Sequence, residues 1–353
     1  MALALAPSSF AETVFALVRL PESNADALEH FDSATPGTVS GLVAITGLNA
    51  GDVLLAIDFR PATGQLYAIS STGRLYVINP TTGVATQVGL NPAFVPSGTD
   101  FGMDFNPVVD LIRVVSDADQ NVRLNPNTGT LFSADTALNP GNPTVVALGY
   151  TNNVAGAAST TLYGIDSGID ALVTIGNPNA NGGTVTTVGS LGFDVTSVAG
   201  LDISPSGTAY AVFHTAVSGS GSFFDTINLA TGAATQVGAI GGTGTVVDIA
   251  VLAWPTAVRM QSLSAVRTAR GVTVRWRAAS SVDTLGFNVY RERRGQRVRV
   301  NRKLILAGFA VAGRTYSFLD RRRFQSGVRY WVQAVATDGS RTWYGPAAAR
   351  RGG

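Results

Sequence analysis

The chain of 353 residues contains no cysteine, a single lysine and two histidines. Without cysteine it can form no disulfide, no zinc–thiolate site and no thiol nucleophile. His30 and His214 are too few for a three-histidine metal site, and neither is accompanied by the G-x-S-x-G pattern of serine hydrolases. The apolar run at residues 246–254 is too short to span a bilayer and is interrupted by Asp248. These absences argue against an enzyme and predict that the chain has no transmembrane segment.

The chain is instead rich in glycine and in short apolar runs. It contains 40 glycines, and its runs of Val, Thr and Ala lack helical periodicity, which is typical of an all-β protein with frequent turns. Residues 56–89 hold four short alternating runs and three turn signals, and similar units begin at Gly102 and Gly200. A unit of this length buries both of its faces only against copies of itself. Four strands per unit predict the blades of a β-propeller.

The number of units predicts five blades. A more divergent unit covers residues 145–192, and the run VVDIAVL at 246–252 resembles a first strand with nothing after it. Three runs near the N-terminus resemble a blade that lacks its first strand, namely residues 14–20, 27–34 and 41–48. Pairing VVDIAVL with these runs closes the ring and removes an open sheet edge. We therefore expect a five-bladed propeller over residues 13–254, closed by strands from both ends.

The segments that flank the propeller have signatures of their own. Residues 1–12 have an apolar stretch that ends in the small-x-small pattern Ser-Phe-Ala at 9–11, which predicts a leader or the remnant of a secretory signal. Residues 255–353 contain six or seven strand-like runs separated by regular turns. Trp276 on an early run and Tyr330 on a late run are typical of an immunoglobulin-like β-sandwich.

Two stretches carry a family resemblance: residues 57–89 and the string FGMDFNPVVDLIRVVSDADQNVRLNPNTG from Phe101. With the motifs DFRP, GRLY and RLNP in this order, residues 13–253 resemble the bacterial secreted propeller family catalogued as domain of unknown function 4394. The tail, with WRAASSVDTLGFNVYRERR and RYWVQAVATDGSRTWYGP, is similar to the fibronectin type III-like modules that end many secreted bacterial proteins. The resemblance implies an exported, extracellular or cell-surface protein without an assigned activity.

The formal net charge of +2 conceals two oppositely charged halves. Residues 1–254 contain five arginines and 19 acidic residues, a net charge of −14. Residues 255–353 contain 19 arginines, one lysine and four acidic residues, a net charge of +16. Such an asymmetry usually reflects the partners of a protein. Arginine in particular suits bidentate contacts with carboxylate, sulfate or phosphate groups.

The basic residues of the C-terminal half are the candidate binding or assembly residues. Most lie along one predicted hairpin, where alternation places Arg297 and Arg299 on one face, and the others form a second cluster. A solvated face without a partner is the alternative for any single one of them. We expect Trp331, Trp343 and Tyr344 to add a small apolar contact. The candidates are Arg291, Arg293, Arg294, Arg297, Arg299, Arg302, Lys303, Arg321, Arg322 and Arg323.

The first strands of the predicted blades place aspartates at one equivalent position, with Gly149 as the exception. If the carboxylates converge on the axis, they can bind a hard cation such as Ca²⁺, the only cofactor that the sequence suggests. Alternatively, each aspartate caps its own turn or accepts hydrogen bonds from the next blade, and its recurrence in the repeats favours this structural role. The four aspartates are Asp58, Asp104, Asp202 and Asp248.

Together these observations predict a secreted, non-enzymatic surface or extracellular-matrix protein. Its acidic propeller and basic sandwich would bind partners or assemble head to tail, with filaments as one outcome. Two alternatives stay open: a propeller hydrolase or lyase with a cation in the axial channel, and a module that binds acidic polysaccharide or the cell surface. Specific nucleic-acid binding is not expected, because no recognition helix or basic-aromatic platform accompanies the charge.

Overall fold

The computed structural model describes residues 11–176, 179–214, 221–252, 260–278, 284–307, 314–322, 327–336 and 341–351. The chain divides into two compact units, Met1–Ala253 and Trp254–Gly353, and each is described by itself. The predicted leader, residues 1–12, lies outside the described residues except for Ala11 and Glu12. No helix among the described residues is long and apolar enough to cross a membrane.

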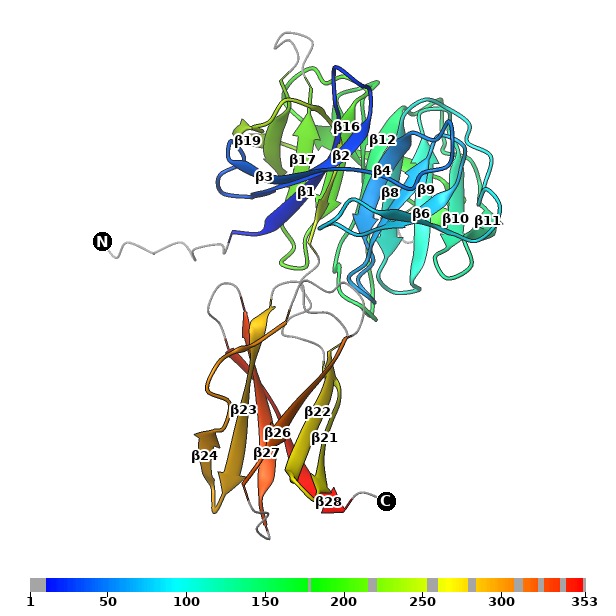
Figure 1. Ribbon diagram of the computed structural model, residues 1–353. Helices are drawn as coiled ribbons and strands as arrows, with labels where there is room; N and C mark the ends of the chain where they lie inside the picture. Colours follow the sequence, from blue (N-terminus) through cyan, green and yellow to red (C-terminus); the bar gives the residue numbers. More distant parts are fainter. Residues whose placement is uncertain are drawn as a thin grey trace, which may run out of the picture. The chain divides into compact units, whose positions relative to one another are not determined.

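The N-terminal unit consists of five sheets of four strands each, arranged as the blades of a propeller (Figure 1). Each blade is given from its innermost strand outward. The first blade consists of β20 (Thr245–Val251), β1 (Thr13–Arg19), β2 (Asp26–Asp32) and β3 (Val39–Ala44), and the second of β4 (Leu54–Phe59), β5 (Leu66–Ser70), β6 (Leu75–Ile78) and β7 (Ala85–Val88). The third blade consists of β8 (Phe101–Asn106), β9 (Leu111–Ser116), β10 (Asn121–Asn125) and β11 (Thr130–Ala134), the fourth of β12 (Val145–Tyr150), β13 (Leu162–Asp166), β14 (Ala171–Ile175) and β15 (Val185–Ser190), and the fifth of β16 (Ala199–Ile203), β17 (Ala209–Phe213), β18 (Phe223–Ile227) and β19 (Ala234–Ala239). A short 3-10 turn, η1 (Ala180–Gly182), precedes β15.

The ring closes as the sequence predicts. Strand β20, from the end of the unit, pairs antiparallel with β1 from its beginning, between the pairs Val14↔Val251 and Arg19↔Thr245. The three N-terminal runs supply the remaining strands of this first blade, so the prediction of five blades closed by both ends is confirmed. The five inner strands form a complete ring, in which neighbouring strands pack in the order β20, β4, β8, β12, β16 and back to β20.

Apolar side chains fill the space between neighbouring blades. Phe31 of the first blade meets Phe224 of the fifth edge to face, with their ring centroids 5.0 Å apart. Tyr67 of the second blade meets Phe105 of the third in the same way, at 5.1 Å. Because each blade shares its core with both neighbours, the blades stabilise one another rather than fold separately.

The outer hairpins use the turn chemistry that their sequences indicate. In three of them an asparagine side chain accepts a hydrogen bond from the N–H two residues ahead, and a glycine takes positive φ. These glycines also touch the preceding blade: a Cβ on Gly129 would lie 1.9 Å from the carbonyl oxygen of Val88. The turn glycine therefore serves blade packing as well as turn geometry, a role that the local sequence did not reveal. The three turns are residues 79–83, 125–129 and 228–232.

The C-terminal unit is one curled sheet of eight strands. Strand β28 joins its two halves, because it pairs antiparallel with β27 and its end pairs parallel with β21. Both halves contribute to one core, which includes Trp276 and Tyr316 from one half and Phe287 and Tyr330 from the other. The strands are β21 (Met260–Thr268), β22 (Gly271–Ala278), β23 (Thr284–Arg293), β24 (Gln296–Arg299), β25 (Ile305–Leu306), β26 (Arg314–Asp320), β27 (Arg329–Ala336) and β28 (Arg341–Arg351).

Candidate functional site

The aligned aspartates lie on the inner strands of the propeller, and three of the four come together. One carboxylate oxygen from each of Asp58, Asp104 and Asp202 lies within 4.8 Å of the other two. These three residues are 1–2 % exposed. Asp248 on β20 is buried as well but is not a member of this group. Gly149 occupies the fifth position, where a Cβ would lie 2.9 Å from Cγ1 of Ile203.

Each of the four aspartates also bonds to the backbone of a neighbouring inner strand. The acceptor is Oδ2 in every case, and the donor is a buried N–H. This is the structural role that the repeats favoured, and it holds each carboxylate in a defined orientation between two blades. The bonds are Phe105 N–H to Asp58 at 2.8 Å, Tyr150 N–H to Asp104 at 3.1 Å, Val251 N–H to Asp202 at 2.6 Å and Ile57 N–H to Asp248 at 2.9 Å.

The second oxygen of the three clustered aspartates is left over. Oδ1 of Asp58, Asp104 and Asp202 is buried and has no hydrogen-bond partner among the described residues. Burial raises the pKa of Asp58 and Asp104 well above the usual aspartate value, and the charges of the neighbouring aspartates raise it further. Burial raises the pKa of Asp202 to about 7. The carboxylates therefore lack a compensating positive charge within the described part of the ring.

A cavity of about 280 Å³ opens on the axis where the inner strands begin. Its lining includes Leu55 of β4, Phe101 of β8, Val146 of β12, Ala199 of β16 and Val247 of β20. Asp58 lies three residues beyond Leu55 on the same strand, which places it roughly 10 Å further along the strand at 3.3 Å per residue. The cavity thus leads into the ring from the end opposite the aspartates.

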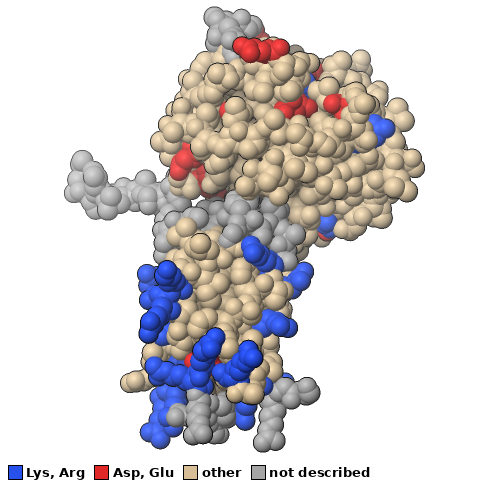
Figure 2. Space-filling view, in the orientation of Figure 1, with Lys and Arg blue, Asp and Glu red and all other residues tan. Residues whose placement is uncertain are grey.

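Few of the acidic residues of the propeller are fully exposed. All 19 acidic residues of this unit are described, and only Glu22, Asp32 and Asp194 are exposed as whole residues. The visible face of the propeller in Figure 2 accordingly carries few acidic side chains. The net charge of −14 therefore overstates the charge that a partner would meet. Nine acidic residues are buried: Glu12, Asp26, Glu29, Asp58, Asp104, Asp166, Asp202, Asp225 and Asp248.

The candidate basic residues of the C-terminal unit divide into those that form ion pairs and those that form none with a described residue. Arg291 donates to Oδ2 of Asp320 at 3.1 Å, and Arg297 donates to Oε2 of Glu292 at 3.1 Å. Arg323 lies outside the described residues. The other seven are exposed and form no ion pair with any described residue: Arg293, Arg294, Arg299, Arg302, Lys303, Arg321 and Arg322. Figure 2 shows basic side chains spread over this unit.

An aromatic cluster lies beside these arginines on the face of the sheet that points away from the core. The guanidinium of Arg297 stacks 3.6 Å above the ring of Trp331 and 5.0 Å from that of Trp343. Tyr290 packs on Trp343 with a centroid distance of 4.6 Å. Trp343 remains 38 % exposed. The sequence placed a charged stripe here. The expectation that no basic-aromatic platform accompanies the charge is wrong, because the platform combines strands β23, β24, β27 and β28.

Tyr344 does not belong to this platform. It pairs with Val332 across β27 and β28 and packs against the core of the unit. Burial raises the pKa of its hydroxyl to about 12. The expectation that Tyr344 joins Trp331 and Trp343 in one contact is therefore wrong, because neighbouring residues of a strand point to opposite faces.

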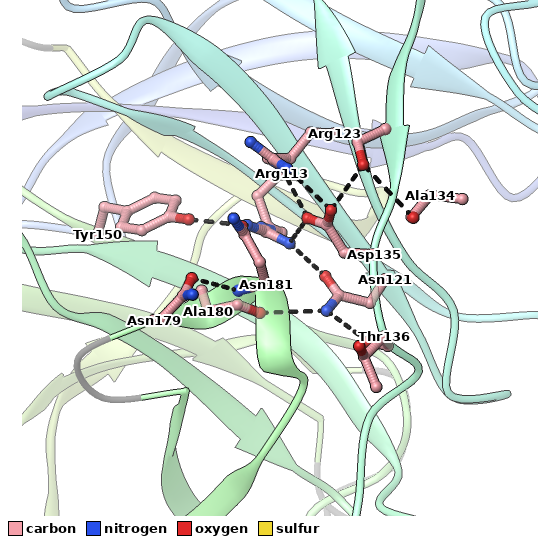
Figure 3. A network of polar contacts seen from close by, with 11 residues as sticks. Arg113, Asn121, Arg123, Ala134, Asp135, Thr136, Tyr150, Asn179, Ala180 and Asn181 are labelled. Atoms are coloured by element: carbon pink, nitrogen blue, oxygen red, sulfur yellow. Dashed lines mark hydrogen bonds and ion pairs between the residues drawn. The ribbon is translucent and has the colours of Figure 1, made fainter.

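A buried polar network between the third and fourth blades has no counterpart in the sequence-based candidates (Figure 3). Arg113 on β9 is 2 % exposed and donates to Asp135, Asn121 and Asn181 at 2.5–2.7 Å. Arg123 pairs with the same Asp135 through two bonds of 2.7 and 2.9 Å. Burial alone would raise the pKa of Asp135, but the hydrogen bonds from Arg123 and the charge of Arg113 outweigh it and lower that pKa.

No curated protein is similar in sequence to this chain. Among solved structures, a protein of unknown function from Bacteroides thetaiotaomicron is 14 % identical over 70 % of this chain and 68 % of its own, with a TM-score of 0.43. A protein from Lactobacillus plantarum is 16 % identical over 96 % of both chains, with a TM-score of 0.34. The WD40 domain of coronin from Toxoplasma gondii is 11 % identical over 93 % of this chain and 86 % of its own, with a TM-score of 0.35. With TM-scores below 0.5, neither fold nor function transfers from these structures.

The sequence pattern of one protein family matches this chain. The family is described as "Domain of unknown function (DUF4394)", and the match covers residues 27–250. These residues include the inner strands β4, β8, β12 and β16, all of β20 except Val251, and the aligned aspartates that the strands carry. Because the match extends over more than half of the chain, this protein belongs to the DUF4394 family.

Proposed function

We propose that this protein is an exported, non-enzymatic binding protein whose C-terminal, fibronectin type III-like unit binds acidic polysaccharides. The observation that carries the proposal is the basic-aromatic platform on strands β23, β24, β27 and β28. Tyr290, Trp331 and Trp343 form its aromatic part, and Arg297 is fixed above them by Glu292. Strand alternation and register place Arg299, Arg329 and Arg341 on the same face.

The chemistry of the platform suits an anionic sugar. Trp343 offers an exposed apolar ring on which a sugar ring can pack, and the arginines offer forked donors to carboxylate or sulfate groups. Arg297 is held between two tryptophans and Glu292, so little of its side-chain freedom is lost on binding. Glu292 is the only acidic residue among the described residues of this face. It is buried and forms ion pairs with Arg297 and Arg329, which neutralise its charge.

Head-to-tail assembly, the other function expected from the charges, has less support. It requires an acidic surface on the propeller, whereas nine of the 19 acidic residues there are buried and three are exposed. Several others are neutralised by neighbours, such as Asp135 by Arg113 and Arg123. An acidic polysaccharide carries the exposed negative charges that the propeller surface lacks, and it therefore suits the basic C-terminal unit better as a partner.

The proposal is tested by titrating the full-length protein with polygalacturonate and with heparin while the fluorescence of Trp343 and its neighbours is followed. We expect binding to both polyanions at low salt, no binding to neutral dextran, and loss of binding near 1 M salt, where the screening length falls to about 3 Å. Replacing Arg299 and Arg341 together by glutamine should weaken binding roughly 5- to 30-fold, at about 0.5–1 kcal/mol for each exposed contact.

Arg275→Gln is the matched control, because Arg275 is exposed on β22 in the other half of the sheet. The proposal fails if Arg275→Gln weakens binding as much as the double variant does, or if dextran binds as well as the polyanions. Salt-sensitive growth in light scattering without added polysaccharide would favour head-to-tail assembly instead.

A further inference from the structure

We propose that the axis of the propeller binds one divalent cation of the calcium type, with Asp58, Asp104 and Asp202 as its protein ligands. The site belongs to the N-terminal unit and is independent of the polysaccharide-binding face proposed for the C-terminal unit. Three observations carry it: the convergence of the three carboxylates, their unpartnered oxygens, and the way neighbouring strands hold them in place.

The distances between the carboxylates match a calcium site. Since one oxygen of each aspartate lies within 4.8 Å of the other two, some point lies within about 2.8 Å of all three oxygens. Calcium binds oxygen at about 2.3–2.6 Å and tolerates irregular geometry, so shifts of a few tenths of an ångström complete the contacts. Magnesium demands a nearly ideal octahedron at about 2.0–2.1 Å, which three side chains from three separate strands are less suited to supply.

The unpartnered oxygens give an independent indication of a ligand. Oδ1 of each of the three aspartates is buried and accepts no hydrogen bond from any described residue. A buried polar atom that makes no hydrogen bond is destabilising, and a buried carboxylate without a counter-charge is more so. No arginine or lysine among the described residues forms an ion pair with Asp58, Asp104 or Asp202. A bound cation removes both penalties at once.

The carboxylates are also held in position before any cation binds. Oδ2 of each aspartate accepts a backbone N–H from the next inner strand, at 2.6–3.1 Å. This bond uses one oxygen for packing and leaves Oδ1 for the cation. The three ligands come from the second, third and fifth blades. A cation at this point therefore ties three blades together across the axis, and we assign it a structural role in holding the ring closed.

The alternative occupant is the proton. Three neutral or partly protonated carboxyl groups would also relieve the repulsion, and the raised pKa values of Asp58 and Asp104 are compatible with that state. The two accounts differ in a measurable way. A cation that binds only the native ring stabilises it with the logarithm of its concentration above Kd, whereas protonated carboxyl groups do not respond to calcium or to a chelator.

The test uses the full-length protein at pH 7.5. It is first dialysed against chelator, then against CaCl₂, and its metal content and melting temperature are measured in both states. We expect one calcium ion per chain after CaCl₂ and gel filtration. At a calcium concentration about 100 times Kd, we expect the melting temperature of the propeller to rise by roughly 5–10 °C. Absence of bound calcium together with an unchanged melting temperature would overturn the proposal.

Asp104→Asn assigns the ligand. The asparagine oxygen can still accept the N–H of Tyr150, while the charge and one metal ligand are lost. In chelator this variant should melt at or above the temperature of the wild type, because the repulsion among the carboxylates is relieved. In CaCl₂ it should lose most of the calcium-dependent rise, with at least a tenfold weaker affinity.

Asp225→Asn is the matched control, because Asp225 is equally buried on β18 but lies outside the cluster. It should retain the full response to calcium. If it loses the response to the same extent as Asp104→Asn, the assignment of the ligands is wrong. If Asp104→Asn fails to fold, the calcium content of the wild type still decides whether the site exists. Polysaccharide binding by the C-terminal unit is measured separately and does not depend on this outcome.

Discussion

Replacing Arg113 by methionine should destabilise the propeller without affecting the C-terminal unit. The guanidinium of Arg113 is buried between the third and fourth blades and donates to Asp135, Asn121 and Asn181. Methionine has a similar length and no donor. The substitution therefore removes the polar contacts while it keeps most of the packing.

The size of the effect follows from what each partner loses. Asp135 keeps its two bonds to Arg123, so its buried charge still has a partner. The penalty of about 3–5 kcal/mol for a buried charge without a partner therefore does not apply. The side-chain oxygen of Asn121 is buried and loses a donor, at about 1–3 kcal/mol for an unsatisfied buried group, whereas Asn181 is half-buried and loses less, because water can replace the donor. Partial relaxation reduces the sum, and we expect a loss of about 2–4 kcal/mol, or roughly 5–15 °C in melting temperature.

The assay separates the two units. All four tryptophans, Trp254, Trp276, Trp331 and Trp343, belong to the C-terminal unit, so tryptophan fluorescence follows that unit, whereas calorimetry records both. Arg113→Met should shift the calorimetric transition of the propeller and leave the fluorescence transition in place.

Arg123→Met is the matched control for Arg113. Its side chain is 20 % exposed and its loss leaves Asp135 paired with Arg113, so we expect a loss of about 1 kcal/mol. If Arg123→Met is as damaging as Arg113→Met, or if the fluorescence transition moves with the calorimetric one, the reasoning is refuted.

Three further substitutions test single features. Burial raises the pKa of Glu29 to about 7, so the native state binds this proton more tightly than the unfolded state, and stability should fall as pH rises from about 4.5 to 7. The Glu29→Gln variant should lack this fall, and should melt above the wild type at pH 8 but not at pH 5. Identical pH profiles of the two proteins would contradict the assignment. Gly129→Ala should lower the free energy of unfolding in urea by about 2–4 kcal/mol, because the position combines a positive φ with a clash against Val88. Gly207→Ala, at a positive φ in open space, should lower it by only about 1–2 kcal/mol. Equal losses would show that the clash with Val88 does not contribute. The buried hydroxyl of Tyr344 has no hydrogen-bond partner among the described residues, so Tyr344→Phe should be neutral or stabilising by up to about 1 kcal/mol, and a larger loss would reveal a bond that the structure lacks.

The number and closure of the blades could be predicted from the sequence, because both depend on local patterns. Alternating runs of four to seven residues specify strands, and Asn and Gly at fixed offsets specify the hairpins between them. The incomplete unit at residues 14–48 and the unpaired run at 246–252 each had one place in a closed ring, and β20 pairs with β1 as expected. Repetition made these predictions secure, since each unit confirmed the interpretation of the next.

The composition of the axial cluster depended on the tertiary structure. Sequence alignment of the units placed four aspartates at one position and could not rank them, whereas the structure brings Asp58, Asp104 and Asp202 together and leaves Asp248 outside the group. Which carboxylates meet is set by distances across the axis, and these depend on how five strands tilt and pack. The unpartnered Oδ1 atoms likewise become visible only when the bonds to the neighbouring strands are known.

Surface chemistry was the part that the sequence misrepresented, for two physical reasons. Net charge is a sum over residues and contains no information on burial, so −14 suggested an acidic surface, whereas nine of the 19 acidic residues are buried and only three are exposed. The face of a strand on which a side chain lies depends on register, and a bulge between Tyr330 and Val332 sets which residues of β27 and β28 lie opposite one another. Local periodicity thus determined the fold of this chain, while burial and register, which arise from contacts distant in sequence, decided where its charges and aromatic rings can act.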